Sequence, residues 1–348
     1  MTVEAKKKEV ALTINEKHVL AKSLKAVVKK VPIPVAGLAL GLAALGNLLQ
    51  PYGEGLHTLL GALSVCLILL LTAKLVMFPK MILDDFSNSV LASVSATYLM
   101  TIMQLSGYLA PVWFEGAFGM WATAIIAHFV LMAWFTYSFL TGGRFKLAEV
   151  FPTYFICFVG VVVASIVSPV FGMETIGMGI FCFGFAAYAV LFVLVTYRYA
   201  KIETAEPTKP LFCIYTAPMS LSLVGYLAIA GEPNTGFVIA ATVLAQMLFA
   251  VVLAKLPSLL RLKFYPSYAA MTFPFVITAT ALGKSLAVLG VDAASPLFWL
   301  AGAETVLAAG MVLYVFGRYV GWLCGDVVRE AMGSSEHGNS ERVSAKAE

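Results

Sequence analysis

Charged residues are scarce in this sequence. Only 12% of its 348 residues are Asp, Glu, Lys or Arg, whereas about 25% is typical of a soluble domain. Apolar residues make up 60% of the chain, against about 45–50% in soluble proteins. A soluble globule of this length cannot hide so much apolar surface from water, so part of it must face lipid. The composition therefore excludes soluble, disordered and fibrous proteins and predicts an integral membrane protein.

Cysteine is scarce as well, and the short motifs of enzymes are missing. The five cysteines are scattered, with no CxxC pair and no Cys/His cluster, which argues against a disulfide framework, a metal site or a redox centre. GxSxG, HExxH and Walker motifs do not occur either. The net charge of +4 is too small to indicate a nucleic-acid partner. We therefore expect no enzyme activity, no cofactor and no nucleic acid.

Long apolar runs dominate what is present. Ten runs have roughly the 20 apolar residues that a transmembrane helix needs. They lie near 31–50, 56–78, 88–110, 117–140, 152–170, 175–197, 211–231, 235–256, 266–289 and 296–320. Very short turns alternate with slightly longer polar loops between them. This alternation predicts an all-α membrane domain over residues 31–320, with ten transmembrane helices arranged as five hairpins.

The basic residues predict the orientation of these spans. Of the 23 Lys and Arg residues, 22 fall in the two tails or in the connections on one side, and Lys284 alone falls on the other side. Because basic residues near span ends resist translocation, both termini should be cytoplasmic, and we expect the plasma membrane as the location. Each opposite connection carries one acid, which is either an ordinary solvated residue or part of a rim that influences ion approach. These acids are Glu54, Glu115, Glu174, Glu232 and Asp292.

Proline distinguishes the odd-numbered spans from the even-numbered ones. Pro34, Pro152, Pro218 and Pro274 lie within or at the start of odd spans, whereas the even spans hold no interior proline. A proline inside a helix removes one backbone hydrogen bond and bends the helix. The third span has Ser and Thr residues instead. The pattern predicts an inner ring of five bent helices around a central pore, inside an outer ring of five straight helices.

The odd spans are also free of charge in their bodies, with Lys284 near the outer end of the ninth. A pore that they line would have walls of apolar side chains, hydroxyl groups and carbonyl groups freed at the prolines. The candidate pore-lining residues are Pro34, Ser93, Thr97, Pro152, Thr216, Pro218, Ser220 and Thr278.

Four sequence strings occur in order on this ten-span frame. They are GLALGLAALGN at 37–47, FPTYF at 151–155, APMS at 217–220 and MTFPF at 271–275. In these strings the chain resembles the tellurite-resistance/dicarboxylate transporter family, which includes the plant guard-cell slow anion channels and yeast malate and sulfite transporters. The resemblance covers roughly residues 31–320.

The resemblance implies a function and a gate. Members of the family transport or conduct anions through a pore that the five inner helices form, and a phenylalanine of the ninth span closes it midway. The corresponding residue here is Phe273, directly before Pro274. The family also implies a homotrimer. Hydroxyl donors and helix-end dipoles would attract an anion weakly at several places, which permits it to leave again.

Three residues leave the transport mechanism open. Glu304, inside span ten, is either a proton-coupling group, a structural contact or a partner of Lys284. His128, inside span four, is either a hydrogen-bonded interior residue or a proton relay. Lys284 either draws anions to the outer mouth or extends to the lipid headgroups. The first hypothesis is anion permeation through a Phe273-gated pore, and the alternative is a proton-coupled transporter of a C4-dicarboxylate such as malate, of sulfite or of tellurite.

The two ends of the chain differ from the spans. Residues 1–30 form a Lys-rich tail without the apolar segment of a cleavable signal, and they suit either an interfacial amphipathic segment or a solvated arm. Residues 321–348 are polar, and we expect a disordered cytoplasmic tail.

Overall fold

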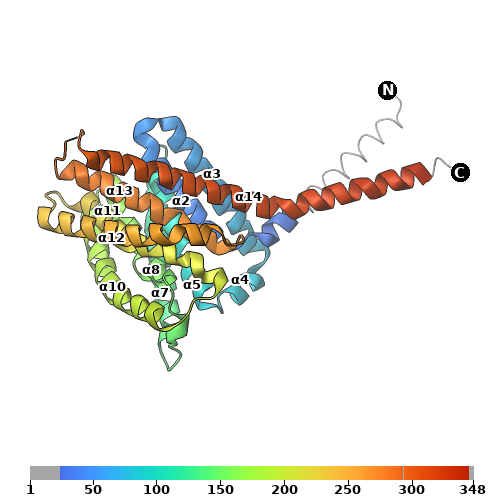
Figure 1. Cartoon of the computed structure of the whole chain (residues 1–348), viewed down its shortest axis with the longest axis horizontal. Helices are drawn as coiled ribbons and strands as arrows, with labels where there is room; N and C mark the ends of the chain where they lie inside the picture. The colour runs from blue at the N-terminus through green and yellow to red at the C-terminus, as the bar shows by residue number, and fades with distance from the viewer. Residues whose placement is uncertain (1–23, 293, 345–348) are drawn as a thin grey trace.

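The computed structural model describes residues 24–292 and 294–344, with side chains up to residue 325. The chain is helical throughout this part, which contains no strand. Residues 24–30 are helical, and the elements that follow are α2 (Val35–Leu49), η1 (Gln50–Tyr52), α3 (Glu54–Met77), α4 (Pro79–Asp85), α5 (Ser89–Val94), α6 (Ala96–Leu109), α7 (Phe114–Phe135), η2 (Thr136–Leu140), η3 (Leu147–Glu149), α8 (Thr153–Phe158), η4 (Gly160–Val162), α9 (Val163–Val167), η5 (Ser168–Phe171), α10 (Glu174–Lys201), η6 (Glu206–Thr216), α11 (Ala217–Ile229), α12 (Thr235–Leu260), η7 (Pro266–Met271), α13 (Phe273–Val288) and α14 (Pro296–Ser344). The helices gather into one bundle, and α14 continues beyond it (Figure 1).

Nine helical segments of the described chain are long and apolar enough to cross a membrane. They correspond to the predicted spans except the fifth, at 152–170. There the chain forms a series of short pieces, α8, η4, α9 and η5. Gly160 and Pro169 interrupt the helix, since proline lacks an N–H and glycine weakens a helix. The chain is thus an all-helical multi-pass protein, and the count of ten spans stays a prediction.

Burial separates the predicted odd spans from the even ones. Between 61% and 78% of the residues are buried in the most apolar stretches of the first, third, seventh and ninth spans. In the even spans the share is only 28–39%. The even helices direct large apolar side chains outward, such as Leu69 on α3 and Val190 on α10. Exposed apolar side chains over whole helices suit contact with lipid rather than water.

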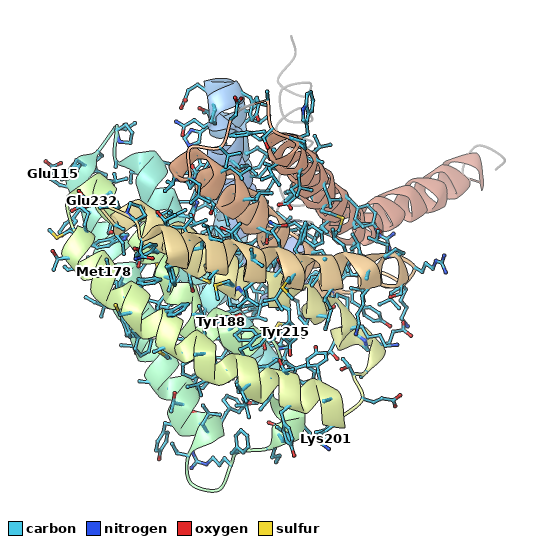
Figure 2. All side chains as sticks on the ribbon, turned by 60° about the vertical axis from the view of Figure 1, so that its left-hand side comes forward. Glu115, Met178, Tyr188, Lys201, Tyr215 and Glu232 are labelled. Atoms are coloured by element: carbon cyan, nitrogen blue, oxygen red, sulfur yellow. The ribbon has the colours of Figure 1, made fainter. Side chains whose placement is uncertain are left out.

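The most buried helices contact one another in a closed cycle. Helix α2 packs against α6, α6 against α9, α9 against α11, α11 against α13, and α13 against α2. All five belong to predicted odd spans. Glu115 and Glu232 lie at one end of the bundle, and Lys201 lies at the other (Figure 2).

The prolines of the odd spans begin helices rather than bend them. Pro34 and Pro152 directly precede α2 and α8, and Pro218 and Pro274 are the second residues of α11 and α13. The first N–H groups of a helix have no partner inside it, so proline is tolerated there without loss of a bond. The expected bends are therefore interruptions, where a 3₁₀ segment or a loop ends and an α-helix starts.

Two details differ from the sequence prediction. The third span is interrupted at Ser95, whose hydroxyl donates to the carbonyl of Ala92 at 2.6 Å. An even span does hold a proline, because α12 extends to Leu260 and includes Pro257. The predicted end at residue 256 was too early. Pro257 lies in the last turn, where the loss of one backbone bond disturbs few others.

The end of the chain also differs from the expected disordered tail. Helix α14 continues to Ser344, so residues 321–344 are helical in the structure. No proline follows Pro296 in this helix, and extending an existing helix avoids the cost of nucleation. Residues 345–348 and most of the Lys-rich tail, 1–23, lie outside the described residues.

Candidate permeation site

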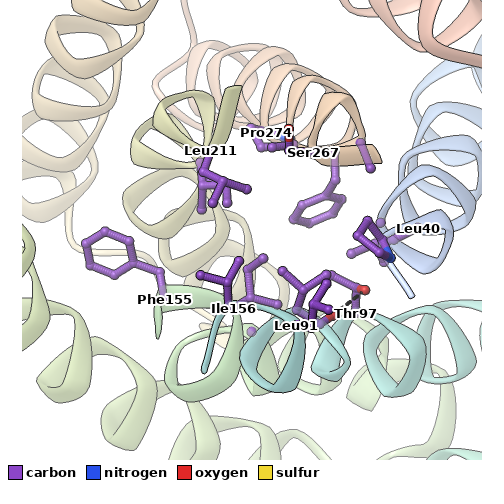
Figure 3. A pocket seen from close by; sticks show the side chains of 18 of the residues that line it. Leu40, Leu91, Thr97, Phe155, Ile156, Leu211, Ser267 and Pro274 are labelled. Atoms are coloured by element: carbon purple, nitrogen blue, oxygen red, sulfur yellow. Dashed lines mark hydrogen bonds between the residues drawn. The ribbon is translucent and has the colours of Figure 1, made fainter. Parts of the chain in front are cut away.

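A central cavity of about 350 Å³ lies among the buried helices (Figure 3). All five predicted odd spans contribute to its wall, for example through Leu40, Met100, Ile156, Leu211 and Pro274. No Asp, Glu, Lys or Arg is among the described residues that line it. The wall is mainly apolar. We call this cavity the chamber.

The chamber meets the first turns of four α-helices. Gly37 of α2, Thr97 of α6, Pro218 of α11 and Phe273 of α13 all line it, and each lies in or next to the first turn of its helix. Several N–H groups of these first turns donate to carbonyls just before them, such as that of Gly37 to Pro34 at 2.9 Å. The N-terminal end of an α-helix nevertheless carries a partial positive charge of about half an elementary charge. The chamber is therefore favourable for an anion although its wall holds no charged side chain.

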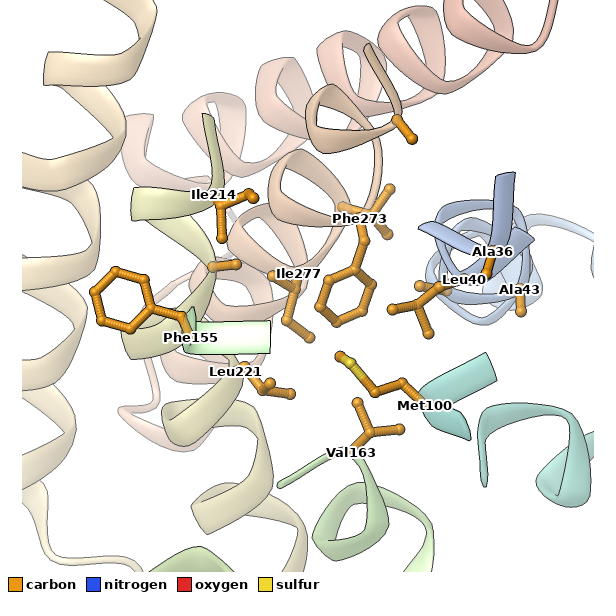
Figure 4. Close-up of a cluster of buried hydrophobic side chains, with 14 of the residues drawn as sticks. Ala36, Leu40, Ala43, Met100, Phe155, Val163, Ile214, Leu221, Phe273 and Ile277 are labelled. Atoms are coloured by element: carbon orange, nitrogen blue, oxygen red, sulfur yellow. The ribbon is translucent and has the colours of Figure 1, made fainter. Parts of the chain in front are cut away.

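Phe273 lines the chamber. Its side chain is 6% exposed, and its ring lies between Leu40 and Ile277, with Met100 and Val163 nearby (Figure 4). Thr272 anchors the preceding backbone, because its hydroxyl donates to the carbonyl of Gly37 at 3.0 Å and to that of Ala269 at 2.7 Å. The ring of Phe273 thus lies among apolar side chains, on a backbone that Thr272 holds against α2.

Close packing of α2 positions the start of α13. A Cβ atom added to Gly41 would lie 2.6 Å from the Cβ of Thr272 and 3.0 Å from the backbone nitrogen of Phe273. A Cβ atom on Gly37 would lie at an ordinary 3.5 Å from the Cβ of Ala269. The GxxxG pair thus serves close helix contact, and Gly41 permits the position that Phe273 takes.

The predicted pore-lining residues fall into two groups. Pro34, Thr97 and Pro218 line the chamber together with Phe273 and Pro274. The residues that do not line it are Ser93, Pro152, Thr216, Ser220 and Thr278.

The hydroxyl groups of the second group join helices to one another. The Thr278 hydroxyl lies 2.7 Å from that of Thr216 and 3.1 Å from that of Ser220, which links α13 to the start of α11. Ser93 donates to the hydroxyl of Thr153 at 2.8 Å, which links α5 to α8. These bonds occupy the groups that the sequence suggested as anion donors.

The possible coupling residues lie apart from the chamber. Glu304 of α14 is 4% exposed and accepts a hydrogen bond from Gln246 of α12 at 3.4 Å. Lys284 is exposed on α13, and no ion pair joins it to Glu304 within the described chain, so the suggested pair is wrong. His128 is fully buried, and its Nε2–H donates to the carbonyl of Cys157 at 2.9 Å. This bond agrees with the interpretation of His128 as a hydrogen-bonded interior residue.

Sequence reasoning missed two buried cations, Lys74 of α3 and Arg198 of α10. Lys74 donates to the carbonyl of Val31 at 2.6 Å, three residues before Pro34. Arg198 donates to the carbonyl of Ile202 at 3.2 Å and to the hydroxyl of Thr204 at 2.9 Å. Neither has a carboxylate within ion-pair distance among the residues whose side chains are described. Asp85 nevertheless lies close enough to act on Lys74 electrostatically. The sequence placed both in polar connections and gave no signal of their burial.

Polar residues of the two connections that contain η6 and η7 meet at the wall of the chamber. The Tyr265 hydroxyl donates to the carboxylate of Glu206 at 2.8 Å, and Ser267 donates to the carbonyl of Pro207 at 2.5 Å. Tyr265, Ser267 and Pro207 line the chamber. The Tyr265 hydroxyl, and then the Glu206 carboxylate, raise the pKa of the nearby Lys263 above its usual value. These bonds hold η6 and η7 side by side next to the chamber.

The described chain is an all-helical multi-pass membrane protein with an apolar chamber among its buried helices. A protein-family model described as "SLAC1: Voltage-dependent anion channel" matches residues 30–320. The chain therefore belongs to this family, the tellurite-resistance/dicarboxylate transporter family that the sequence strings indicated. Membership supports anion transport across a membrane. A search of curated proteins gave no match.

Proposed function

We propose that this protein is an anion channel whose pore Phe273 closes. The observation that carries the proposal is the chamber: all five odd spans line it, Phe273 is part of its wall, and none of the described residues that line it is charged. A charge-free wall suits a channel, because fixed cations at the narrowest point would hold an anion too tightly for fast exit.

Opening requires only that the ring of Phe273 moves. Its neighbours Leu40, Met100 and Ile277 are apolar, so a change of rotamer breaks no hydrogen bond of the side chain. In the closed position the ring blocks ions by its size and keeps the constriction free of water. Rotation of one ring thus switches the pore between a dry and a wet state.

Anion preference has two supports. The four first turns at the chamber attract negative charge at short range, and the buried cations Lys74 and Arg198 add positive potential. An apolar wall replaces little of the hydration shell of an ion. Weakly hydrated anions should therefore permeate better than strongly hydrated ones.

The proposed topology follows from the same arrangement. Ten transmembrane segments form five hairpins, in which the closed cycle of α2, α6, α9, α11 and α13 makes the inner ring. Both termini are cytoplasmic in the plasma membrane, since the basic residues gather at one end. Residues 31–320 form the transmembrane domain between two cytoplasmic tails. The protein assembles as a homotrimer with one pore per chain, and its bound partners are a small anion and the bilayer lipids.

Glu304 supports a second candidate, the proton-coupled transport of malate, sulfite or tellurite. A carboxyl group inside a membrane helix, 4% exposed and bonded only to a neutral amide among the described residues, is a candidate for binding a proton. It lies on α14, whose residues do not line the chamber. Coupling would therefore have to act through the packing of α14 against α13.

Current measurements in planar bilayers test the two candidates. We expect Phe273→Ala to produce a large anion current that does not depend on a pH gradient. Phe275→Ala is the matched control, because Phe275 is equally buried but packs on Phe249 with 5.4 Å between ring centroids and does not line the chamber. An unchanged current in Phe273→Ala, or equal currents in both variants, would contradict the gate. Uptake that collapses with the proton gradient and in Glu304→Gln would favour the coupled transporter.

A further inference from the structure

A second, smaller cavity lies outside the chamber, among α3, α4, α6 and α7. Its volume is about 160 Å³. Its wall is almost wholly apolar. The lining residues are Ile33, Leu71, Leu75, Ile82, Phe86, Ser95, Tyr98, Leu99 and Leu131.

The two hydroxyl groups of this cavity already have partners. Ser95 donates to the carbonyl of Ala92 at 2.6 Å, and the hydroxyl of Tyr98 is shared with that of Thr72 at 2.8 Å. A buried water needs two to four polar partners, and an apolar cavity of roughly 150 Å³ lined by Leu, Ile and Phe stays dry and binds small apolar molecules. The cavity therefore suits an apolar ligand and not water.

The cavity opens toward the outer surface of the bundle. Ile33, Leu71, Ile82 and Ser95 of its wall are buried, and the other lining residues are partly exposed: Leu75, Phe86, Tyr98, Leu99 and Leu131. The ring of Phe86 lies 5.4 Å from that of Trp134 on α7, and Trp134 is 37% exposed. On either side, α3 and α7 carry exposed apolar side chains such as Val76 and Val130. In a multi-pass membrane protein, the molecules that meet such a surface are lipid acyl chains.

We propose that this cavity binds one acyl chain of a bilayer lipid. The chain enters between α3 and α7 and reaches Ser95 and Leu99, at the interruption between α5 and α6. It fills a void whose walls otherwise lack contacts on one side. Val94 and Thr97, on the other face of the same segment, line the chamber. A bound acyl chain therefore packs directly behind the wall of the chamber.

Photolabelling of the protein in liposomes tests the proposal. The probe is a phosphatidylcholine that carries a diazirine on one acyl chain, and the labelled residues are identified by peptide mass spectrometry. We expect labels on residues 95–99, where Ser95, Tyr98 and Leu99 line the cavity, in addition to labels on the outer faces of α3 and α7. Labels restricted to the exposed faces of α3 and α7 would overturn the proposal.

Variants that fill the cavity supply the second arm of the test. Leu75→Phe combined with Leu131→Phe should abolish the labels on residues 95–99, whereas the matched control Leu69→Phe should keep them, because Leu69 is 61% exposed on the same helix. Labels on the exposed face of α7 and a single elution peak verify the fold. Should the double variant not fold, Leu131→Phe alone should reduce the labels. Equal labels in filled and control proteins contradict the site.

Discussion

Substitution of Gly41 by alanine tests how the gate residue is positioned. The added Cβ atom would lie 2.6 Å from the Cβ of Thr272, whereas ordinary contacts of a Cβ atom begin at 3.4 Å. Helices α2 and α13 must therefore separate by at least about 0.8 Å at this point. The opposing atoms are the Cβ and the hydroxyl oxygen of Thr272 and the backbone nitrogen of Phe273. The hydroxyl can turn away, but the Cβ and the backbone nitrogen move only with α13.

The expected loss of stability follows from this overlap. Overpacking a tight interior contact typically costs about 1–3 kcal/mol. Because the strain acts on the closed position of Phe273, part of it should favour the open pore, and about 1.4 kcal/mol of bias would raise the open population tenfold. We expect Gly41→Ala to lower the unfolding temperature in detergent and to increase the anion leak of otherwise wild-type protein in liposomes.

Gly37→Ala is the control for this prediction. It lies one helical turn away on the same face, and its added Cβ atom would meet Ala269 at an ordinary 3.5 Å. We expect its stability and leak to match those of the wild type. If Gly41→Ala also behaves as the wild type, the contact between α2 and the start of α13 does not hold the gate, and the reasoning fails.

Three further substitutions test other parts of the structure. Thr278→Val removes the hydroxyl that joins α13 to α11 and should destabilise the fold by about 1–3 kcal/mol in thermal unfolding. The control Thr280→Val loses only a bond within its own helix and should cost less. Equal losses would refute a role for the inter-helix bonds. Arg198→Gln should reduce anion current entering from the end that carries the basic residues, more strongly at low salt than at high salt, and a loss independent of salt would contradict the electrostatic explanation. His128→Phe should lower the unfolding temperature, because it leaves the carbonyl of Cys157 without its donor. The dependence of the anion flux on pH should stay unchanged. A loss of this dependence would identify His128 as a proton relay.

The sequence strings predicted the family and the region of the chamber. The family match covers 30–320, close to the predicted membrane domain, and the odd spans are the more buried ones. The prolines indicated correctly where helices are interrupted. They did not distinguish a bent helix from a new one, because proline is compatible with both a kink and a first turn.

Hydroxyl groups were harder to place from the sequence. Ser93 and Thr97 lie one turn apart in the third span and looked equivalent as donors to an anion. The interruption at Ser95 separates α5 from α6, so that Thr97 lines the chamber while Ser93 bonds to Thr153. Lys74 and Arg198 were likewise assigned to polar loops, and only folding buried them against backbone carbonyls.

Residue composition alone determined that this protein lies in a membrane, because the free energy of moving a side chain from water to lipid depends mainly on its type. The face that each helix directs inward depends instead on its neighbours, since a helix can turn about its axis until its side chains pack. The tertiary structure therefore decided which residues line the chamber, which hydroxyl groups join helices, and that Gly41 leaves the space in which Phe273 lies.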